Sequence, residues 1–437
     1  MKIHRRKIFH TDPSLRLDLY TEREWGIKMK KCCTMLMLVI IGLSGFGCGT
    51  KEKGEVTEIT LLHGWGTMEE DHQVMRQIYQ DFEKENPDIR LNMVSMPSFE
   101  KAVAKAQDML AVGKVPDLVF TGGKGKDDLY AFMVDHGYAL DLMPYIREDP
   151  ELLESISPVI WERWVNENGE LYTVSDVLLL SGYWYNKTIF ENAGIEKVPE
   201  DWNDFFECCE KICRWANEER ISTVSLHLDP ETCLYLTAAG MAAGDESDQE
   251  LARALDRLER LKTVSSVEDQ DYTHRDKVRS FNIGHSAICV NGVWGQQLLH
   301  PNLNVGYALF PTEDGAGVGM VSACTGYLVG DSADEKKKQA CIRFLKYMLS
   351  EPVQKRILRE TGQVPSNPQI DLEEVYAERP DLYEAYQVVM GAEKFTEIPA
   401  SRWNSQWIEE YSRNIEDFLQ GEITLENFLQ DIEKKGK

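Results

Sequence analysis

Three tryptophans of this 437-residue chain stand where a strand end or a glycine-containing turn would expose an indole ring. Trp65 follows the apolar run 58–63 and is flanked by two glycines. Trp184 lies in the apolar run 171–185, and Trp294 follows a turn that contains glycine. A flat apolar ring suits the CH face of a sugar, whose hydroxyl groups need planar polar partners. Each ring is equally suited to a core, because tryptophan is highly buried on average.

Polar side chains near these positions are candidate partners for hydroxyl groups. Glu69 follows Trp65 at the start of an expected helix, where a carboxylate is also an ordinary partner of the helix dipole. Tyr183 and Trp184 are neighbours in an expected strand, so only one of the two would face a ligand. By position alone, the other candidates are Thr121, Asp176, Thr325 and Arg402.

Catalytic motifs are absent from the sequence. It contains no GxSxG, no HExxH and no metal-spaced cluster of histidine or cysteine. The stretch 122–126 is glycine-rich but lacks the spacing of a phosphate loop, and Asp127 stands where a hydroxyl should bind magnesium. The stretch 315–319 opens no helix and is therefore no dinucleotide fingerprint. We expect no catalytic residue, no cofactor and no metal, although abundant carboxylates leave a glycosidase open.

Charge and cysteine usage limit the possible partners. The net charge is −25 and the isoelectric point is about 4.8. Such an acidic chain has no electrostatic reason to bind nucleic acid or an anionic membrane surface. The ten cysteines contain no CxxC, and we interpret those of the body as reduced, buried, small hydrophobic residues.

The N-terminal segment resembles a lipoprotein export signal. Residues 29–48 combine two lysines, a short apolar core and small residues before Cys48. The apolar run is too short to span a bilayer comfortably, and Gly45 stands where such signals prefer leucine. We expect a lipid anchor on Cys48, a tether at 49–57, and an upstream extension at 1–28 that precedes the true start. A plain signal peptide is the alternative.

Hydrophobic patterning predicts an α/β fold for the body of the chain. Strands are expected at 58–65, 89–94 and 116–120, with helices at 68–85 and 99–112. This alternation favours parallel pairing, and ligands of such sheets lie beyond the carboxyl ends of the strands. The run 171–185 is too long for one ordinary strand, and Ser181–Gly182 is its expected bend.

Several segments carry a specific resemblance to one family. Segment 169–202 contains Tyr-Asn-Lys at 185–187, followed by a short helix pattern and a Pro-x-x-Trp. Segment 281–294 ends in Asn-Gly-Val-Trp, and Thr-Gly-Gln-Val-Pro stands at 361–365. These segments resemble the family 1 extracellular solute-binding proteins, the sugar-binding components of ABC importers. The resemblance covers roughly residues 58–367.

The resemblance implies a two-lobed, periplasmic-binding-protein-like α/β fold, in which discontinuous lobes are joined by a hinge. It favours Trp294 as a stacking floor on the second lobe and adds Trp403 as a candidate ligand residue. The implied lobe 1 comprises 58–172 with a return segment at 325–365, and the implied lobe 2 comprises 173–324 with C-terminal helices at 366–437.

The implied function is the capture of a sugar or oligosaccharide by hinge closure, without catalysis. The implied partner is the permease pair of an ABC importer. The protein would be a monomer on the outer face of the cytoplasmic membrane, which it would touch only through the lipid on Cys48. A glycan-active enzyme and a surface glycan adhesin remain open as alternatives, as does a solute other than a sugar.

Overall fold

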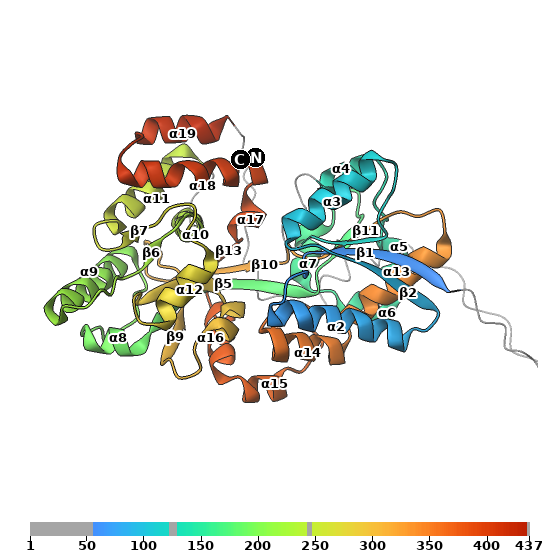
Figure 1. Ribbon diagram of the computed structural model, residues 1–437, viewed down its shortest axis with the longest axis horizontal. Coiled ribbons are helices and arrows are strands. Elements are labelled where there is room, and N and C mark those ends of the chain that lie inside the picture. Colours follow the sequence, from blue (N-terminus) through green and yellow to red (C-terminus); the bar gives the residue numbers. More distant parts are fainter. Residues whose placement is uncertain (1–55, 122–128, 243–246, 435–437) are drawn as a thin grey trace, which may run out of the picture. The chain divides into compact units, whose positions relative to one another are not determined.

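The computed structural model describes residues 56–121, 129–242 and 247–434 (Figure 1). The expected export signal with Cys48 lies outside these residues. From Val56 onward the chain forms one compact unit. Within it, two large sheets and their helices form the two lobes that the sequence predicts, and we call them lobe 1 and lobe 2.

Lobe 1 is built on a five-stranded sheet in the order β2-β1-β3-β11-β4. β1 pairs in parallel with both β2 and β3, which confirms the predicted parallel strands, whereas β11 is antiparallel to β3 and β4. The strands are β1 (Thr57–His63), β2 (Ile89–Ser95), β3 (Leu118–Phe120), β4 (Thr173–Val174) and β11 (Tyr327–Val329).

The helices of lobe 1 bury one apolar face each. In α2, the side chains of Met75, Ile78, Tyr79 and Phe82 recur at helical spacing and are all buried. In α3, the hydroxyl of Ser98 accepts a hydrogen bond from the N–H of the first turn and so begins the helix. The helices are α2 (Glu70–Glu85), α3 (Phe99–Ala111), α4 (Ala131–Asp135), α5 (Met143–Glu148), α6 (Pro150–Ser155), α7 (Pro158–Trp164), α13 (Glu335–Met348) and α14 (Glu351–Thr361).

Lobe 2 is built around one long strand, β5. β5 pairs with β12 and β10 along its first half and with β8 and β9 along its second half. β13 extends this sheet beside β10, and β6 pairs with β7 in a separate small sheet. The strands are β5 (Val177–Asn186), β6 (His227–Leu228), β7 (Ser266–Val267), β8 (Ile288–Gly292), β9 (Val305–Ala308), β10 (Gly319–Ser322), β12 (Val364–Pro365) and β13 (Phe395–Thr396).

The helices of lobe 2 surround this sheet, and α18 packs on both α10 and α19 near the C-terminus (Figure 1). They are α8 (Lys187–Asn192), α9 (Trp202–Glu219), α10 (Pro230–Gly240), α11 (Asp248–Leu261), α12 (His274–Asn282), the 3₁₀ helix η2 (Val293–Leu298), α15 (Glu373–Glu378), α16 (Pro380–Met390), α17 (Pro399–Arg402), α18 (Ser405–Gln420) and α19 (Leu425–Glu433).

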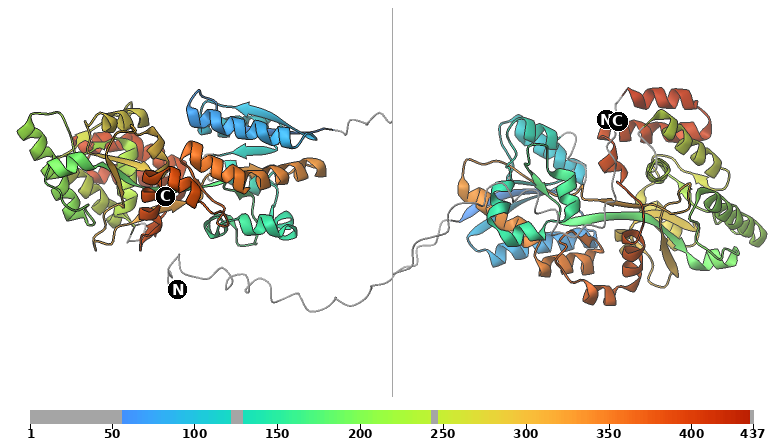
Figure 2. Two further views of the ribbon diagram at one scale, coloured as in Figure 1. Left: turned by 90° about the horizontal axis from the view of Figure 1, so that it is seen from below. Right: turned by 180° about the vertical axis from the view of Figure 1, so that it is seen from behind.

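The chain passes between the two sheets at short crossovers. One is Ser175–Asp176, between β4 and β5, and another is the segment 323–326, between β10 and β11. The break in the run 171–185 therefore lies before β5, and not at Ser181–Gly182 as the sequence predicts. Gly182 sits inside β5, the long green strand in the right view of Figure 2. A Cβ at this position would lie 2.2 Å from the carbonyl oxygen of Ala308. This glycine permits the close approach of β9 and does not bend the strand.

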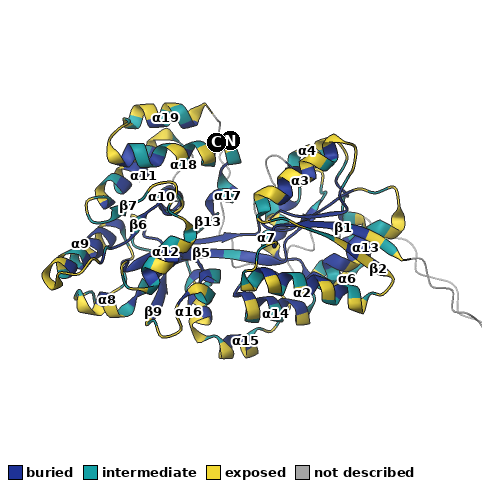
Figure 3. Cartoon of the chain, in the orientation of Figure 1, coloured by how far each residue is buried: buried dark blue, intermediate teal, exposed yellow. Residues whose placement is uncertain are grey.

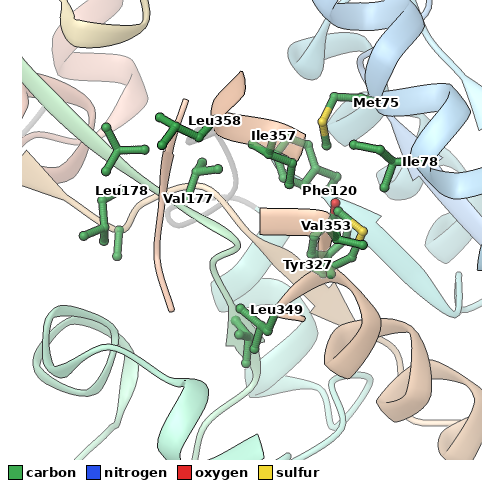
Figure 4. Packing of buried hydrophobic residues seen from close by; sticks show 14 of the residues in the cluster. Met75, Ile78, Phe120, Val177, Leu178, Tyr327, Leu349, Val353, Ile357 and Leu358 are labelled. Atoms are coloured by element: carbon green, nitrogen blue, oxygen red, sulfur yellow. The ribbon is translucent and has the colours of Figure 1, made fainter. Parts of the chain in front are cut away.

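The core lies between each sheet and its helices, and the strands are buried while the outer helix faces are exposed (Figure 3). Next to the crossovers, Val353 and Ile357 of α14 pack in one cluster with Phe120, Val177 and Tyr327 (Figure 4). These contacts tie the start of β5 to the sheet of lobe 1.

Candidate functional site

A chain of hydrogen bonds begins at Asp176 in the first crossover. The hydroxyl of Tyr327 donates to Asp176 Oδ2 at 3.1 Å. That hydroxyl lies 3.0 Å from the hydroxyl of Tyr79, and because its only proton goes to Asp176, Tyr79 donates to Tyr327. The second carboxylate oxygen, Asp176 Oδ1, is buried and has no hydrogen-bond partner among the described residues.

Asp176 carries its charge under unfavourable conditions. Asp176 is 1% exposed, and no lysine, arginine or histidine in the described part of the chain forms an ion pair with it. Burial raises the pKa of Asp176 to about 6, while the hydrogen bond from Tyr327 acts in the opposite direction. A buried carboxylate with a free oxygen is an acceptor for a hydroxyl group, and such perturbed groups are common at functional sites.

The backbone of both crossovers is fixed by side chains. Ser175 Oγ donates to the carbonyl of Ala323 at 2.6 Å, and Trp164 Nε1 donates to the same oxygen at 2.6 Å. Gln354 Nε2 donates to the carbonyl of Asp176 at 2.8 Å. The carboxylate therefore stands on a segment that α7 and α14 hold in place.

Three other predicted residues lie near this chain of hydrogen bonds. The N–H of Thr121 donates to the carbonyl of Gly326 in the second crossover at 3.0 Å. Thr325, next to it, is buried and its hydroxyl has no partner among the described residues. Trp65 is also buried and packs with its ring centroid 5.4 Å from that of Phe120. Its indole N–H forms no hydrogen bond of ordinary geometry with the described residues, although it acts on Tyr79 to lower the pKa of that hydroxyl. The structure thus brings Trp65, Thr121, Asp176 and Thr325 together at the end of the lobe 1 sheet.

Glu69 lies at the N-terminus of α2 and is already engaged. Its carboxylate accepts from Thr67 Oγ1 at 3.2 Å, lies 3.4 Å from His72 Nε2, and pairs with Arg275 of α12 in lobe 2. Glu69, Asp71 and His72 also place potential metal-ligand atoms within 4.8 Å of one another. Since Arg275 forms an ion pair with the Glu69 carboxylate, we describe these residues as an ionic contact between the lobes.

Tyr183 and Trp184 alternate across β5 as expected, but both point into cores. Tyr183 is 0% exposed and packs edge-on against Phe205, with ring centroids 5.6 Å apart. Trp184 is 1% exposed, and its Nε1 donates to the carbonyl of Gly292 at 3.1 Å. Because both rings are buried, their exposure does not show which of the two would face a ligand.

Trp294 is a half-buried ring of lobe 2. It lies in η2, and its six-membered ring covers Gly292, where a Cβ would come within 2.1 Å of it. Asn291, in the same turn, has a buried side-chain N–H₂ without a partner in the described part of the chain. A side chain at position 292 would collide with the ring, so this arrangement requires glycine there.

Arg402 and Trp403 close the end of α10. The guanidinium group donates to the carbonyls of Ala238 and Met241 at 2.9 and 3.0 Å, and it lies 5.3 Å from the Trp403 ring. Trp403 is 3% exposed and stacks on Trp407 with ring centroids 4.4 Å apart. These contacts give both predicted residues a structural role within lobe 2.

A charged cluster in lobe 2 was missed by sequence reasoning. Lys277 of α12 is 3% exposed, and its Nζ lies 2.7 Å from Glu231 Oε2 and 3.7 Å from Asp229 Oδ1. His274 Nδ1 lies 3.3 Å from the same oxygen of Glu231. Burial opposes ionisation of Glu231, but Lys277 outweighs it and holds the pKa of this carboxyl well below its usual range.

This cluster lies next to the contact between the lobes, because His274 is followed by Arg275, the partner of Glu69. The Glu231 side chain is 47% exposed. The signal in the sequence was weak: Lys277 shares its helix face with the buried residues Val278 and Phe281, where a lysine needs a carboxylate partner.

Comparison with known proteins identifies the family. The sequence pattern of the bacterial extracellular solute-binding proteins matches residues 77–384. The chain belongs to this family. A curated relative of this solute-binding protein, the multiple sugar-binding protein of Streptococcus mutans, is 23% identical over 341 residues, which cover 71% of this chain and 77% of the relative.

Solved structures of other solute-binding proteins share the fold. A Streptococcus pneumoniae solute-binding protein in complex with the blood group A trisaccharide has a TM-score of 0.71 at 22% identity, covering 86% of this chain and 99% of the other. A chitin oligosaccharide binding protein has a TM-score of 0.72 at 22% identity, covering 86% and 98%. These likenesses confirm the predicted two-lobed α/β fold. Among the described residues, no helix combines the length and the apolar character that crossing a bilayer requires.

Proposed function

We propose that this solute-binding protein captures a sugar or oligosaccharide and delivers it to the permease pair of an ABC importer, without chemical change. The observation that carries the proposal is Asp176 Oδ1, a buried acceptor at the junction of the two lobes that has no hydrogen-bond partner among the described residues. Family membership and the sugar ligands named for similar proteins support it.

In this proposal the ligand lies between the lobes. Asp176, Thr325 and Trp65 contact it from lobe 1 and the crossovers, while the Trp294 ring contacts it from lobe 2. Asp176 Oδ1, the Thr325 hydroxyl and the Trp65 N–H are supporting observations, because each is a buried polar atom without a partner in the described residues. The crossovers at 175–176 and 323–326 act as the hinge.

The same proposal covers the cellular setting. Cys48 carries a lipid that anchors the protein to the outer face of the cytoplasmic membrane, and residues 49–57 connect the anchor to lobe 1. The protein acts as a monomer, since each molecule delivers one ligand to one permease pair. Metabolic labelling with an alkyne fatty acid tests the anchor: label on the wild type and none on C48A is the expected result.

Calorimetric titration tests the sugar. The full-length chain is titrated with the blood group A trisaccharide, chitotriose and maltotriose, and each mixture is analysed by chromatography afterwards. We expect at least one sugar to bind and to be recovered intact, and D176N to bind it more weakly than wild type. Cleavage of a sugar would replace this proposal with the enzyme alternative, and the absence of binding across a broad panel would reject it.

A further inference from the structure

Asp176 is surrounded by groups that do not compensate its charge. The hydroxyl of Tyr327, from β11, donates to Asp176, and the hydroxyl of Tyr79, from α2, bonds to that of Tyr327. From β1, the ring of His63 lies 5.3 Å from that of Tyr79. From α14, Gln354 binds the backbone carbonyl of Asp176 and carries no charge.

Two basic side chains of α2, Arg76 and His72, form hydrogen bonds with Thr67. Arg76 donates to the carbonyl of Thr67 at 2.9 Å, and His72 lies 2.8 Å from Thr67 Oγ1. Among the described residues, Tyr327 is the one side chain that donates to this carboxylate, and Oδ1 has no hydrogen-bond partner there.

We propose that Asp176 is a pH-sensitive switch for ligand binding. Tyr327 and Tyr79 are the positioning residues that stabilise its ionised form, which accepts hydrogen bonds. The inference rests on the proposed function and extends it to the regulation of the same site. Ionised Asp176 accepts from Tyr327 with one oxygen and from a ligand hydroxyl with the other. Once protonated, the carboxyl group has a proton on one oxygen, and one of these two acceptor positions becomes a donor.

Asp176 is the group of this set that changes charge between about pH 5 and pH 7. Burial lowers the pKa of His63 to about 4, so its imidazole stays neutral there. Burial also raises the pKa of both tyrosines, which therefore keep their protons and remain donors. Asp176 itself, with a pKa of about 6, passes from the charged to the neutral form within this range.

The sign of the effect follows from linkage. A ligand that donates to the carboxylate binds the ionised form better, so binding lowers the pKa of Asp176 and releases a proton near and below pH 6. Acidification, which protonates Asp176, therefore weakens binding. If only the ionised form binds, the dissociation constant should be about tenfold larger at pH 5 than at pH 7. Removal of the Tyr327 hydroxyl destabilises the ionised form and should move the midpoint upward by about one pH unit.

The test measures dissociation constants between pH 4.5 and pH 8 for the full-length protein. The probe is whichever of the blood group A trisaccharide, chitotriose and maltotriose binds most tightly. We compare wild type with D176N, Y327F and Y79F, and with Y145F as a control. The Tyr145 hydroxyl bonds Glu335 on an exposed surface at 3.2 Å, so Y145F removes a similar hydrogen bond outside the site.

The expected result is a step near pH 6 for wild type and Y145F, no step for D176N, and a step at higher pH for Y327F, with a smaller shift for Y79F. A merely structural role of Tyr327 would lower stability without moving the midpoint. Binding that is independent of pH in wild type, or the same step in D176N, would overturn this inference and leave the proposed function intact. Failure of every sugar to bind at any pH would reject the proposed function and this inference with it.

Discussion

Asp176 and Glu231 are two carboxylates that the protein treats in opposite ways. Asp176 at the crossover is 1% exposed, has no cationic partner in the described part of the chain and has a raised pKa. Glu231 in lobe 2 is half exposed, holds the buried ammonium group of Lys277 and has a lowered pKa. One charge is left uncompensated where two lobes meet, and the other is fixed within one lobe. The difference supports the proposed role of Asp176 in ligand binding, which costs stability, whereas Glu231 belongs to a permanent ionic cluster.

Removal of Lys277 should have the largest effect on stability. Lys277→Met fills a similar volume but leaves Asp229, whose side chain is 5% exposed, without its cation. We expect the free energy of unfolding to fall by about 3–5 kcal/mol, because an uncompensated charge remains buried. Urea denaturation at pH 7 measures this, with Lys197→Met as the control, since Lys197 pairs with Glu200 on the surface and its side chain is 70% exposed. Equal stability of the two variants would contradict the description of this cluster as a buried one.

Neutralisation of Asp176 should raise the free energy of unfolding, whereas removal of Lys277 should lower it. Its folded-state pKa of about 6 lies above the usual value of 3.8, so its contribution to stability is largest below about pH 4 and is lost as pH rises through about 6. Asp176→Asn removes this loss and should raise the free energy of unfolding by about 3 kcal/mol at pH 7. At pH 4 the gain should shrink to below about 1 kcal/mol. Urea denaturation of wild type and D176N without sugar checks both values, and a gain that does not depend on pH would show that ionisation of Asp176 is not its origin.

Truncation of Trp294 tests whether this ring of lobe 2 contacts the ligand or belongs to the core. If the half-buried ring is a stacking surface, Trp294→Ala should weaken sugar binding by about 1–3 kcal/mol and change stability little. If the ring is part of a core, the same change should cost about 3–5 kcal/mol of folding free energy. Denaturation and calorimetric titration of this one variant separate the outcomes. A large loss of stability with unchanged affinity per folded molecule would remove Trp294 from the site.

The sequence predicted those parts of the fold that depend on local periodicity. The alternating strands and helices of lobe 1 were recognisable because their apolar residues recur at strand or helix spacing. The bend in the run 171–185 was misplaced, because Gly182 signals either a bend or a close approach, and only the pairing with β9 distinguishes them. Local pattern alone also could not tell that Trp184 is a core residue on β5.

Prediction of the site was limited by contacts between distant residues. Asp176 was chosen by position, but its significance lies in Tyr79 and Tyr327, which are far from it in sequence and meet it only in the folded sheet. Glu231 was missed because its partner Lys277 lies on another helix. Electrostatic relationships of this kind depend on burial and distance, which no short motif encodes.

The contact between Glu69 and Arg275 should have the smallest effect, and it tests whether the two lobes meet as described. The Arg275 side chain is 77% exposed and that of Glu69 is 39% exposed, so solvent and salt screen the pair. A double-mutant cycle with Glu69→Gln and Arg275→Gln, read as sugar affinity, should give a coupling energy of about 0.2–1 kcal/mol at low salt. This coupling should decline between about 50 mM and 500 mM sodium chloride, because the pair joins α2 of lobe 1 to α12 of lobe 2 near the surface. If E69Q instead abolishes binding while R275Q has no effect, Glu69 contacts the sugar directly, as its position in the sequence first suggested. A coupling that appears in affinity and is absent from stability would assign the pair to the ligand-bound arrangement of the lobes.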